Sequence, residues 1–215
     1  MLIQPGSKLV MIGDSITDSG RQRPVGEGLF EALGKGYVSI VNGLIGAAIP
    51  GDRIRVVNMG ISGNTVRDLE SRWETDVVGL NPDWLSVMIG INDVWRQFDS
   101  PLQAEWHVMI GEYETILDRL CAKTRPSLKG LVLMAPYFIE PNRSDPMRAM
   151  MDRYGAVVKK LASKHKAVFV DTQAAFDDVL ANMHPVAMAW DRIHPNTVGH
   201  AVIARAFLKA VGYVW

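Results

Sequence analysis

The sequence lacks several features that would place it in a specialised class of protein. It has a single cysteine, Cys121, so the chain can form no internal disulfide and no cysteine-based metal cluster. Its 23 Lys and Arg residues balance its 23 Asp and Glu residues, which argues against binding to nucleic acid or to an anionic membrane surface. It has no apolar run of the roughly 18 residues that span a bilayer, and no basic segment ahead of an apolar one at its start. We therefore expect a cytoplasmic protein.

What the chain does contain is typical of one globular domain. Of its 215 residues, 48% are hydrophobic and 21% are charged, and this length is sufficient to bury one sizeable core. Short apolar segments rich in strand formers alternate with longer segments of helical period. This alternation predicts a three-layer α/β/α domain over residues 1–215, in which helices cover both faces of a mostly parallel sheet.

Five strands and six helices are predicted from these patterns. The strands cover residues 9–12, 53–59, 84–89, 129–135 and 167–171, and the helices cover residues 37–49, 66–78, 102–123, 147–165, 172–182 and 196–211. In the helix 102–123, Trp106 and Met109 fall on the apolar stripe and are expected in the core. Cys121 lies in the same helix and is expected to be a small buried apolar residue.

The first predicted strand ends abruptly at Gly13-Asp14-Ser15. A strand that stops there leaves the Ser15 hydroxyl at the carboxyl edge of the sheet, where ligands bind in open α/β proteins. Asp and Ser are also preferred N-caps, so this tripeptide alone also fits the start of a helix. The loop 19–36 follows Ser15, and turn-rich segments 60–65 and 90–93 follow the second and third strands. The sequence thus predicts three polar loops at one edge of the sheet.

A second candidate group lies just before the last predicted helix. Asp191 and His194 are three residues apart in a loop, so the carboxylate can reach one imidazole nitrogen while the other nitrogen faces outward. A serine hydrolase needs this arrangement, because the carboxylate fixes the tautomer of the histidine that takes the serine proton. Alone, the pair also fits a turn and a helix start. Together with Ser15 on the same sheet edge, it predicts a catalytic triad.

Acyl transfer also needs hydrogen-bond donors aimed at the oxyanion that develops in the transition state. The backbone N–H of Ser15 is one candidate, and Gly63 in the second loop can present its N–H without a side chain in the way. Asn92 in the third loop offers a side-chain amide. Glycine and asparagine are also common turn formers, so these two assignments depend on the triad.

Four motifs, in order along the chain, resemble the marker blocks of the SGNH (GDSL) hydrolase superfamily. They are Gly13-Asp14-Ser15, Gly63 within NMGISGN, Gly90-Ile91-Asn92-Asp93 and Asp191-Arg192-Ile193-His194. The one departure is GDSIT in place of GDSL in the first block. The resemblance implies a flavodoxin-like fold with five parallel strands, with Ser15 as nucleophile, His194 as base and Asp191 as its orienting acid. It also implies an oxyanion hole made of Ser15, Gly63 and Asn92. Such chemistry needs no metal and no organic cofactor.

Longer segments around these blocks resemble the intracellular bacterial acetylxylan esterases. The segments are residues 20–28, 60–69, 88–97 and 189–195. This resemblance implies a homo-oligomer that acts on an acetylated xylo-oligosaccharide. Residues around a catalytic site do not fix the alcohol half of an ester, so thioesterase, lysophospholipase and other carbohydrate esterase activities stay open. A non-catalytic carbohydrate-binding protein or a nucleotide binder is disfavoured, because a binder has no need of Ser, His and Asp together.

Several side chains near the predicted triad could bind a sugar. Trp95 and Trp190 flank the oxyanion and triad loops, where they could stack on a pyranose ring or pack against the protein. Hydroxyl groups could be bound by three arginines, Arg21, Arg23 and Arg96. We expect Asp14 and His184 to be structural.

Overall fold

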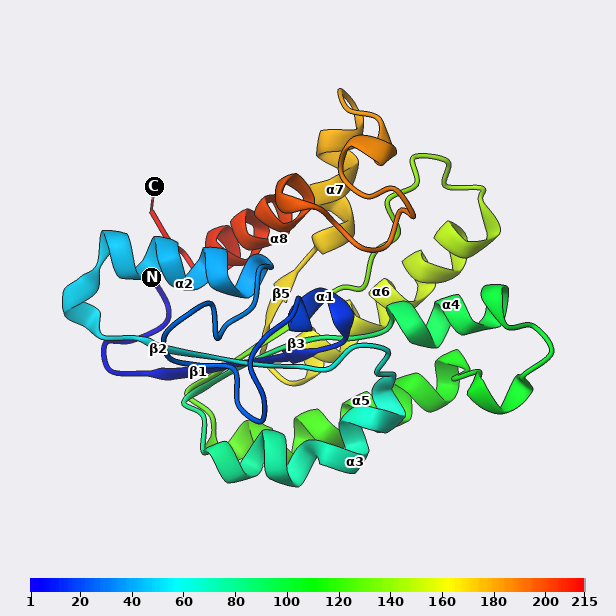
Figure 1. Ribbon diagram of the computed structural model, residues 1–215. Helices are drawn as coiled ribbons and strands as arrows, with labels where there is room; N and C mark the ends of the chain where they lie inside the picture. Colours follow the sequence, from blue (N-terminus) through cyan, green and yellow to red (C-terminus); the bar gives the residue numbers. More distant parts are fainter. Residues whose placement is uncertain (215) are drawn as a thin grey trace.

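The computed structural model describes residues 1–214, and its centre is a sheet of five parallel strands (Figure 1). In chain order the strands are β1 (Lys8–Gly13), β2 (Arg55–Gly60), β3 (Trp84–Met88), β4 (Gly130–Met134) and β5 (Val168–Val170). They lie in the spatial order β2-β1-β3-β4-β5, and every neighbouring pair is parallel. The predicted five-stranded parallel sheet is confirmed.

The strands form because their apolar segments are buried on both faces. All residues of β3 and β4 are buried, as are all but the first residue of β1 and of β2. Strands covered on both faces have continuous rather than alternating apolar runs, which is why the sequence shows them clearly. β5, at one edge of the sheet, is short and partly exposed.

Helices cover both faces of the sheet. Six of them are α2 (Tyr37–Ala48), α3 (Val66–Asp76), α5 (Ile110–Thr124), α6 (Pro146–Lys164), α7 (Thr172–Leu180) and α8 (Thr197–Ala210). Short 3-10 helices cover Pro50–Asp52, Val78–Leu80, Ala104–Trp106, Arg125–Ser127 and Pro185–Ala187. α2 packs against α8, and α7 lies beside α8, whereas α3 and α6 both pack against α5. Figure 1 shows α2 and α8 above the sheet and α3 and α5 below it.

The order of the strands brings three segments of the chain together. β1 lies between β2 and β3, so the segment after β1 is flanked by the segments that follow both neighbours. The strand order reverses between β1 and β3, and such switch points form the ligand crevices of open α/β sheets. Ser15, Gly63 and Asn92 follow β1, β2 and β3 respectively and therefore meet at this crevice.

One segment predicted as a loop is largely helical. The helix α4 (Ile91–Asp99) begins directly after Gly90, so Asn92 lies in a first helical turn. Gly90 has a φ of 130°, a conformation open to glycine, and this lets the chain turn sharply out of β3 into the helix. The prediction of a loop over residues 90–93 is therefore wrong, because the glycine ends the strand without delaying the helix.

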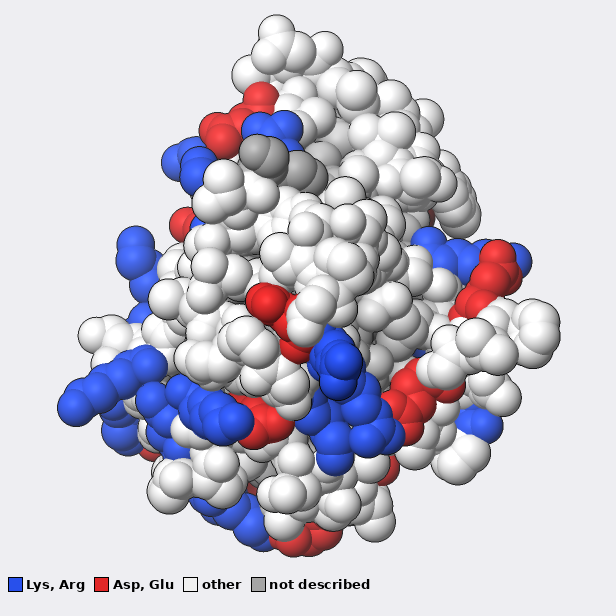
Figure 2. All heavy atoms as spheres, turned by 90° about the vertical axis from the view of Figure 1, so that its left-hand side faces the viewer, with Lys and Arg blue, Asp and Glu red and all other residues white. Residues whose placement is uncertain are grey.

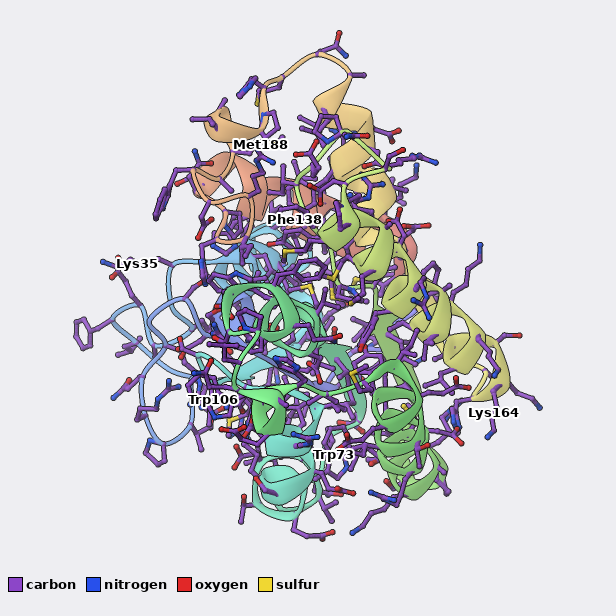
Figure 3. The ribbon with its side chains drawn as sticks, turned by 90° about the vertical axis from the view of Figure 1, so that its right-hand side faces the viewer. Lys35, Trp73, Trp106, Phe138, Lys164 and Met188 are labelled. Atoms are coloured by element: carbon purple, nitrogen blue, oxygen red, sulfur yellow. The ribbon has the colours of Figure 1, made fainter. Side chains whose placement is uncertain are left out.

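The predicted helix 102–123 is wrong over its first two turns. α5 begins at Ile110, and the carbonyl oxygens of Glu105 and His107 accept hydrogen bonds from Arg67 of α3 instead of from helical N–H groups. Trp106 is 53% exposed and lies on the outside of this connection (Figure 3), and Met109 is exposed as well, so neither is a core residue. The later part of the prediction holds, since Cys121 is buried on α5.

Charged side chains of both signs are mixed on the surface. The basic run at the end of α6 pairs with acids of α5: Lys160 Nζ lies 2.6 Å from Glu114 Oε1, and Lys164 Nζ lies 2.6 Å from Asp118 Oδ2. Figure 2 shows the same mixture on the face at the left of Figure 1. None of the helices within residues 1–214 has the length and apolar content needed to cross a membrane.

Candidate active site

Ser15 is the first residue of the short helix α1 (Ser15–Asp18), directly after β1. Asp14 is the N-cap of this helix, and its Oδ1 accepts a hydrogen bond from the backbone N–H of Ile16 at 3.0 Å. Both interpretations of the tripeptide are therefore right at once. Asp14 caps a helix, as expected for a structural residue. Ser15 presents its hydroxyl at the carboxyl edge of the sheet.

The structure brings Ser15, His194 and Asp191 together as a continuous chain of hydrogen bonds. Ser15 Oγ lies 3.0 Å from His194 Nε2, and His194 Nδ1 lies 2.7 Å from Asp191 Oδ2. The carboxylate can only accept, so Nδ1 carries a proton and Nε2 is free to accept from the serine hydroxyl. Burial opposes ionisation of Asp191, but hydrogen bonds from the side chain and backbone of His194 and from the Ile193 N–H lower the pKa of its carboxyl. This arrangement can deprotonate Ser15.

The three predicted oxyanion donors differ in the hydrogen bonds that they already make. Among residues 1–214, no hydrogen bond uses the backbone N–H of Ser15 or of Gly63. Asn92 is buried, and one hydrogen of its Nδ2 is donated to the carbonyl oxygen of Asn64 at 2.9 Å, which orients the amide and leaves its second hydrogen free. Gly63 has a φ of 81°, which a side chain would disfavour. Ser15 and Gly63 line one cleft, and Asn92 is joined to the residue after Gly63 through the carbonyl oxygen of Asn64.

An open cleft of about 530 Å³ lies over these groups. It is lined by Ser15, Ile16, Ser19, Gly20, Ser62, Gly63, Trp95, Arg96, His194, Pro195 and His200. The Trp95 ring meets the His194 ring edge-on at a centroid distance of 5.9 Å, and the Arg96 guanidinium lies 4.6 Å from the centre of the Trp95 ring. Trp95 therefore packs against the base, with Arg96 over its ring. Trp190 is 82% exposed, next in sequence to Asp191.

Comparison with known proteins places this site in a family. The model of the GDSL-like Lipase/Acylhydrolase family matches residues 11–202, which is most of the chain and includes every residue of the predicted triad and of the predicted oxyanion hole. The chain belongs to this family. The prediction of an ester hydrolase with the SGNH fold is confirmed.

The similarity to individual family members covers the whole chain. This GDSL hydrolase is 58% identical to an acetylxylan esterase of Geobacillus stearothermophilus, over 100% of the present chain and 98% of the relative. The crystal structure of Axe2, an acetylxylan esterase of that organism, has a TM-score of 0.99 at 58% identity and the same coverage. LAE5, an α/β hydrolase from the metagenome of Lake Arreo, has a TM-score of 0.98 at 57% identity, with 99% of this chain and 98% of LAE5 covered. Solved structures of Axe2 include its catalytic mutants S15A, D191A and H194A.

Two buried carboxyl groups of this GDSL hydrolase lie behind the nucleophile. Burial raises the pKa of Asp14 to about 7 and that of Asp93 to about 7, and the charge of Asp14 adds to the rise at Asp93. Asp93 Oδ1 accepts a hydrogen bond from the Val66 N–H at the start of α3, whereas its Oδ2 has no partner within residues 1–214. Asp93 belongs to the third marker block, but nothing in the sequence indicated that it would join α4 to α3. No group of three His, Cys, Asp or Glu side chains in residues 1–214 is placed to hold a metal ion.

Arg72 connects the ends of two strands to the loop that contains Gly63. From α3, its Nη2 donates to the carbonyl oxygen of Gly13 at 3.0 Å and its Nη1 donates to that of Met59 at 2.8 Å. Its Nε donates to Asn64 Oδ1 at 2.7 Å. Asn64 in turn orients the amide of Asn92. This role could not be read from the sequence, because Arg72 lies outside the apolar stripe of the predicted helix 66–78 and would be expected on its exposed face.

Arg21, one of the three arginines that could have bound substrate hydroxyl groups, is instead buried against backbone carbonyl oxygens. Arg21 is only 5% exposed. Its guanidinium donates to three carbonyl oxygens at 2.7–3.0 Å, those of Gly60, Gln22 and Pro24. Such carbonyls need donors when they are buried, and Arg21 provides them from one rigid fork. The group holds the loop after α1 against the end of β2. His184, expected to be structural, accepts a hydrogen bond from the Val186 N–H at the start of a 3-10 helix.

A second histidine, His200 of α8, lies in the wall of the same cleft. Its Nδ1 accepts a hydrogen bond from the Tyr37 N–H at 3.2 Å, and its Nε2 lies 3.3 Å from Ser19 Oγ. Burial, with a contribution from His194, lowers the pKa of His200 to about 4. This side chain is therefore neutral at physiological pH. It joins the last helix to the segment that follows the nucleophile.

Proposed function

We propose that the chain is a single-domain serine esterase that removes acetyl groups from xylo-oligosaccharides. The observation that carries the chemistry is the chain of hydrogen bonds from Ser15 through His194 to Asp191, at 3.0 and 2.7 Å. The substrate rests on similarity to the acetylxylan esterase of Geobacillus stearothermophilus at 58% identity over the full chain. The catalytic mutants S15A, D191A and H194A of Axe2 are substituted at residues of the same type and number as this triad.

The geometry supports a two-step mechanism through an acyl-serine. Ser15 Oγ attacks the acetyl carbonyl while His194 Nε2 accepts its proton, and the carbonyl oxygen becomes an oxyanion. The N–H groups of Ser15 and Gly63 and the free hydrogen of the Asn92 amide stabilise that oxyanion. His194 then gives its proton to the leaving sugar hydroxyl. Water, activated by His194, repeats the same steps on the acyl-enzyme and releases acetate.

The shape of the cleft supports a small acyl group on a sugar. The cleft is open, and Ile16, Trp95 and Pro195 provide its apolar part beside the triad. Trp190 is exposed next to Asp191, where its face is available to a pyranose ring. Arg96 forms an ion pair with Asp99 and lies over Trp95, so it contributes to the cleft wall. Of the exposed side chains around the cleft, Trp190 is the one to which we assign sugar binding.

We also propose that the protein acts in the cytoplasm as a homo-oligomer. The proposal draws support from large apolar side chains that are strongly exposed and that a contact between copies would cover, among them Phe30 (97%), Leu102 and Trp106. Sedimentation velocity of the native protein and of Phe30→Ser tests this, because loss of an apolar contact should shift the variant to smaller species. A native protein that sediments as a monomer would rule out the oligomer. Cell fractionation tests the location.

Acetate release separates the proposed substrate from its alternatives. The native protein and Ser15→Ala are each incubated with acetylated xylo-oligosaccharides, with an aryl acetate and with an aryl octanoate. We expect acetate from the first two substrates, little cleavage of the octanoate, and no turnover by Ser15→Ala. Cleavage of the aryl esters alone would keep the serine esterase and reject the sugar substrate. Turnover retained by Ser15→Ala would reject the mechanism.

A further inference from the structure

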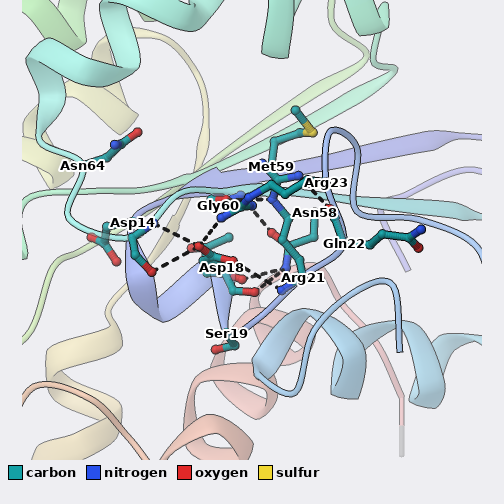
Figure 4. A network of polar contacts seen from close by, with 12 residues as sticks. Asp14, Asp18, Ser19, Arg21, Gln22, Arg23, Asn58, Met59, Gly60 and Asn64 are labelled. Carbon is teal, nitrogen blue, oxygen red and sulfur yellow. Dashed lines mark hydrogen bonds and ion pairs between the residues drawn. The ribbon is translucent and has the colours of Figure 1, made fainter. Parts of the chain in front are cut away.

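The last residue of α1, Asp18, is buried and is the centre of a polar network that connects the nucleophile helix to the loop after β2 (Figure 4). Its Oδ2 accepts three hydrogen bonds. One comes from Arg23 Nη2 at 2.6 Å, one from the backbone N–H of Ser62 at 3.0 Å and one from Ser62 Oγ at 3.1 Å. A single carboxylate oxygen therefore holds both the backbone and the side chain of the residue that precedes Gly63.

These contacts fix the peptide that carries the Gly63 N–H. On one side, Asp18 holds the N–H and the hydroxyl of Ser62, which restricts the backbone and side-chain torsions of that residue. On the other side, the carbonyl oxygen of Asn64 accepts from Asn92 Nδ2. Gly63 lies between these two anchors and lines the cleft, and no group within residues 1–214 accepts a hydrogen bond from its N–H. Gly63 has no side chain to hold it, so its orientation depends on its neighbours.

Asp18 stays ionised and in place because the loop after α1 surrounds it with donors. Burial opposes its ionisation, but hydrogen bonds from Arg23 and Ser62 lower the pKa of its carboxyl. Its Oδ1 accepts from the Arg21 N–H at 3.3 Å. The side chains of Arg21 and Arg23 both donate to the carbonyl oxygen of Gly60, at 2.7 and 3.1 Å, which fixes the start of the same loop.

We propose that Asp18 is a positioning residue of the oxyanion hole, which holds the Gly63 N–H at the place where the oxyanion forms. The proposal deepens the serine esterase mechanism and rests on it. Asp18 touches neither substrate nor the reacting atoms; it acts through Ser62. Donors of an oxyanion hole work because they are fixed before the reaction, and a displacement of about 1 Å can cost roughly 100-fold in rate. Loss of Asp18 should therefore weaken the binding of the transition state more than that of the substrate.

Asp18→Asn tests the proposal, with Arg23→Gln as its matched control. The Asn amide is uncharged and places an NH2 group at one of the two oxygen positions, where it faces a donor: the Arg21 N–H at Oδ1, or Ser62 and Arg23 at Oδ2. The side chain must therefore shift or accept more weakly, and its contacts to Ser62 are displaced or weakened. Arg23→Gln removes the ion pair and leaves both Ser62 contacts. With an aryl acetate as substrate, we expect kcat to fall roughly 10- to 100-fold in Asp18→Asn with KM within about twofold. We expect a loss of less than about threefold in Arg23→Gln. Inhibition by a boronic acid, whose adduct with Ser15 is tetrahedral, should weaken in parallel with kcat.

The outcomes separate this proposal from the mechanism on which it rests. If Ser15→Ala loses all turnover while Asp18→Asn keeps its kcat and its affinity for the boronic acid, the positioning role alone is rejected. Equal losses in Asp18→Asn and Arg23→Gln would also reject it, since they would point to the ion pair. Thermal unfolding by circular dichroism verifies that each variant is folded. If Asp18→Asn does not fold, Ser62→Ala removes the hydroxyl contact alone, and an unchanged kcat and boronic acid affinity there would overturn the proposal.

Discussion

Ser15 and His194 face each other across the cleft, but they are supported in different ways. His194 is held from within its own loop: Asp191 Oδ2 accepts from its ring, and Asp191 Oδ1 accepts from the backbone N–H groups of Ile193 and His194 at 2.9 and 2.8 Å. Its side chain is 43% exposed. The corner around Ser15 is instead supported across several elements: the buried Asp18 of α1 holds the loop after β2, and Arg72 of α3 donates to the carbonyl oxygen of Gly13 at the end of β1.

The difference follows from what each half must do. In the proposed mechanism His194 takes a proton from Ser15 and gives it to the leaving sugar oxygen, so its ring needs one fixed nitrogen and access to the cleft. A local contact three residues away is sufficient for that. The oxyanion donors must be at fixed positions before charge develops, and only a network that spans several elements holds backbone groups so firmly. We therefore expect that loss of one contact is enough to inactivate the base loop, which holds Asp191 and His194. Substitutions in the buried corner around Ser15 should instead displace the oxyanion donors or lower the stability of the fold.

The largest effect on the catalytic rate should come from the exposed loop that holds Asp191 and His194. Asp191→Asn offers an amide that can donate to Nδ1, which favours the tautomer with the proton on Nε2 and stops His194 from accepting the Ser15 proton. We expect kcat to fall by about 10³- to 10⁴-fold, with little change in thermal stability because the loop is half exposed. Steady-state kinetics on an aryl acetate, beside circular dichroism, measures both. A loss of less than about tenfold would show that Asp191 does not set the tautomer.

In the buried half, Asn92→Ala should cost less in rate. It removes one of the three oxyanion donors, and such a loss typically lowers kcat by about 10²- to 10³-fold. Because the donor acts on the oxyanion, KM should change little. Kinetics on the same ester tests this, and an effect confined to KM would assign Asn92 to substrate binding instead.

Stability of the buried corner should depend on pH through Asp14. Its pKa is about 7 in the folded protein and 3.8 as an ordinary side chain, so the folded state binds more protons between these values. Stability therefore falls as pH rises from about 4 to about 7 and is level above that. Asp14→Asn keeps an acceptor for the Ile16 N–H and cannot ionise. We expect it to flatten the decline in unfolding free energy between pH 5 and 8 by roughly 1–3 kcal/mol.

Urea unfolding at several pH values measures this change, with Asp18→Asn as the control. The pKa of Asp18 is lowered rather than raised, so Asp18 is ionised in both states above pH 5 and its replacement should not change the slope. If native protein and Asp14→Asn have the same slope, Asp14 does not carry the buried proton.

The smallest effect should come from Trp190, at the outer end of the base loop. Trp190→Ala should raise KM for acetylated xylo-oligosaccharides about 2- to 10-fold, the value of one aromatic contact, and leave KM for an aryl acetate unchanged. Initial rates on the two substrates provide the comparison. Equal changes for both would assign Trp190 to packing of the loop.

The same difference explains what the sequence could predict. Ser15, Gly63, Asn92, Asp191 and His194 each lie in a short motif, and the parallel strands before three of these residues are continuous apolar runs. Residues that hold the site through contacts with segments far away in the sequence form no such motif. Asp18 looks like a helix residue and Arg21 like an exposed arginine until the end of β2 is placed beside them. Trp106 was misplaced for the same reason, because Arg67 of another helix takes the carbonyls that would have continued α5.

The contact between His200 and Ser19 shows why closeness of serine and histidine is not enough for catalysis. Tyr37 donates its N–H to His200 Nδ1, so that nitrogen has no proton and Nε2 must carry it. His200 consequently donates to Ser19, whereas His194 accepts from Ser15. Ser19 Oγ gives its own hydrogen to the carbonyl oxygen of Ile16 at 3.1 Å. One cleft thus contains two serine–histidine pairs of opposite polarity, and an active-site phosphonate would select between two hydroxyls four residues apart by the direction of a single proton.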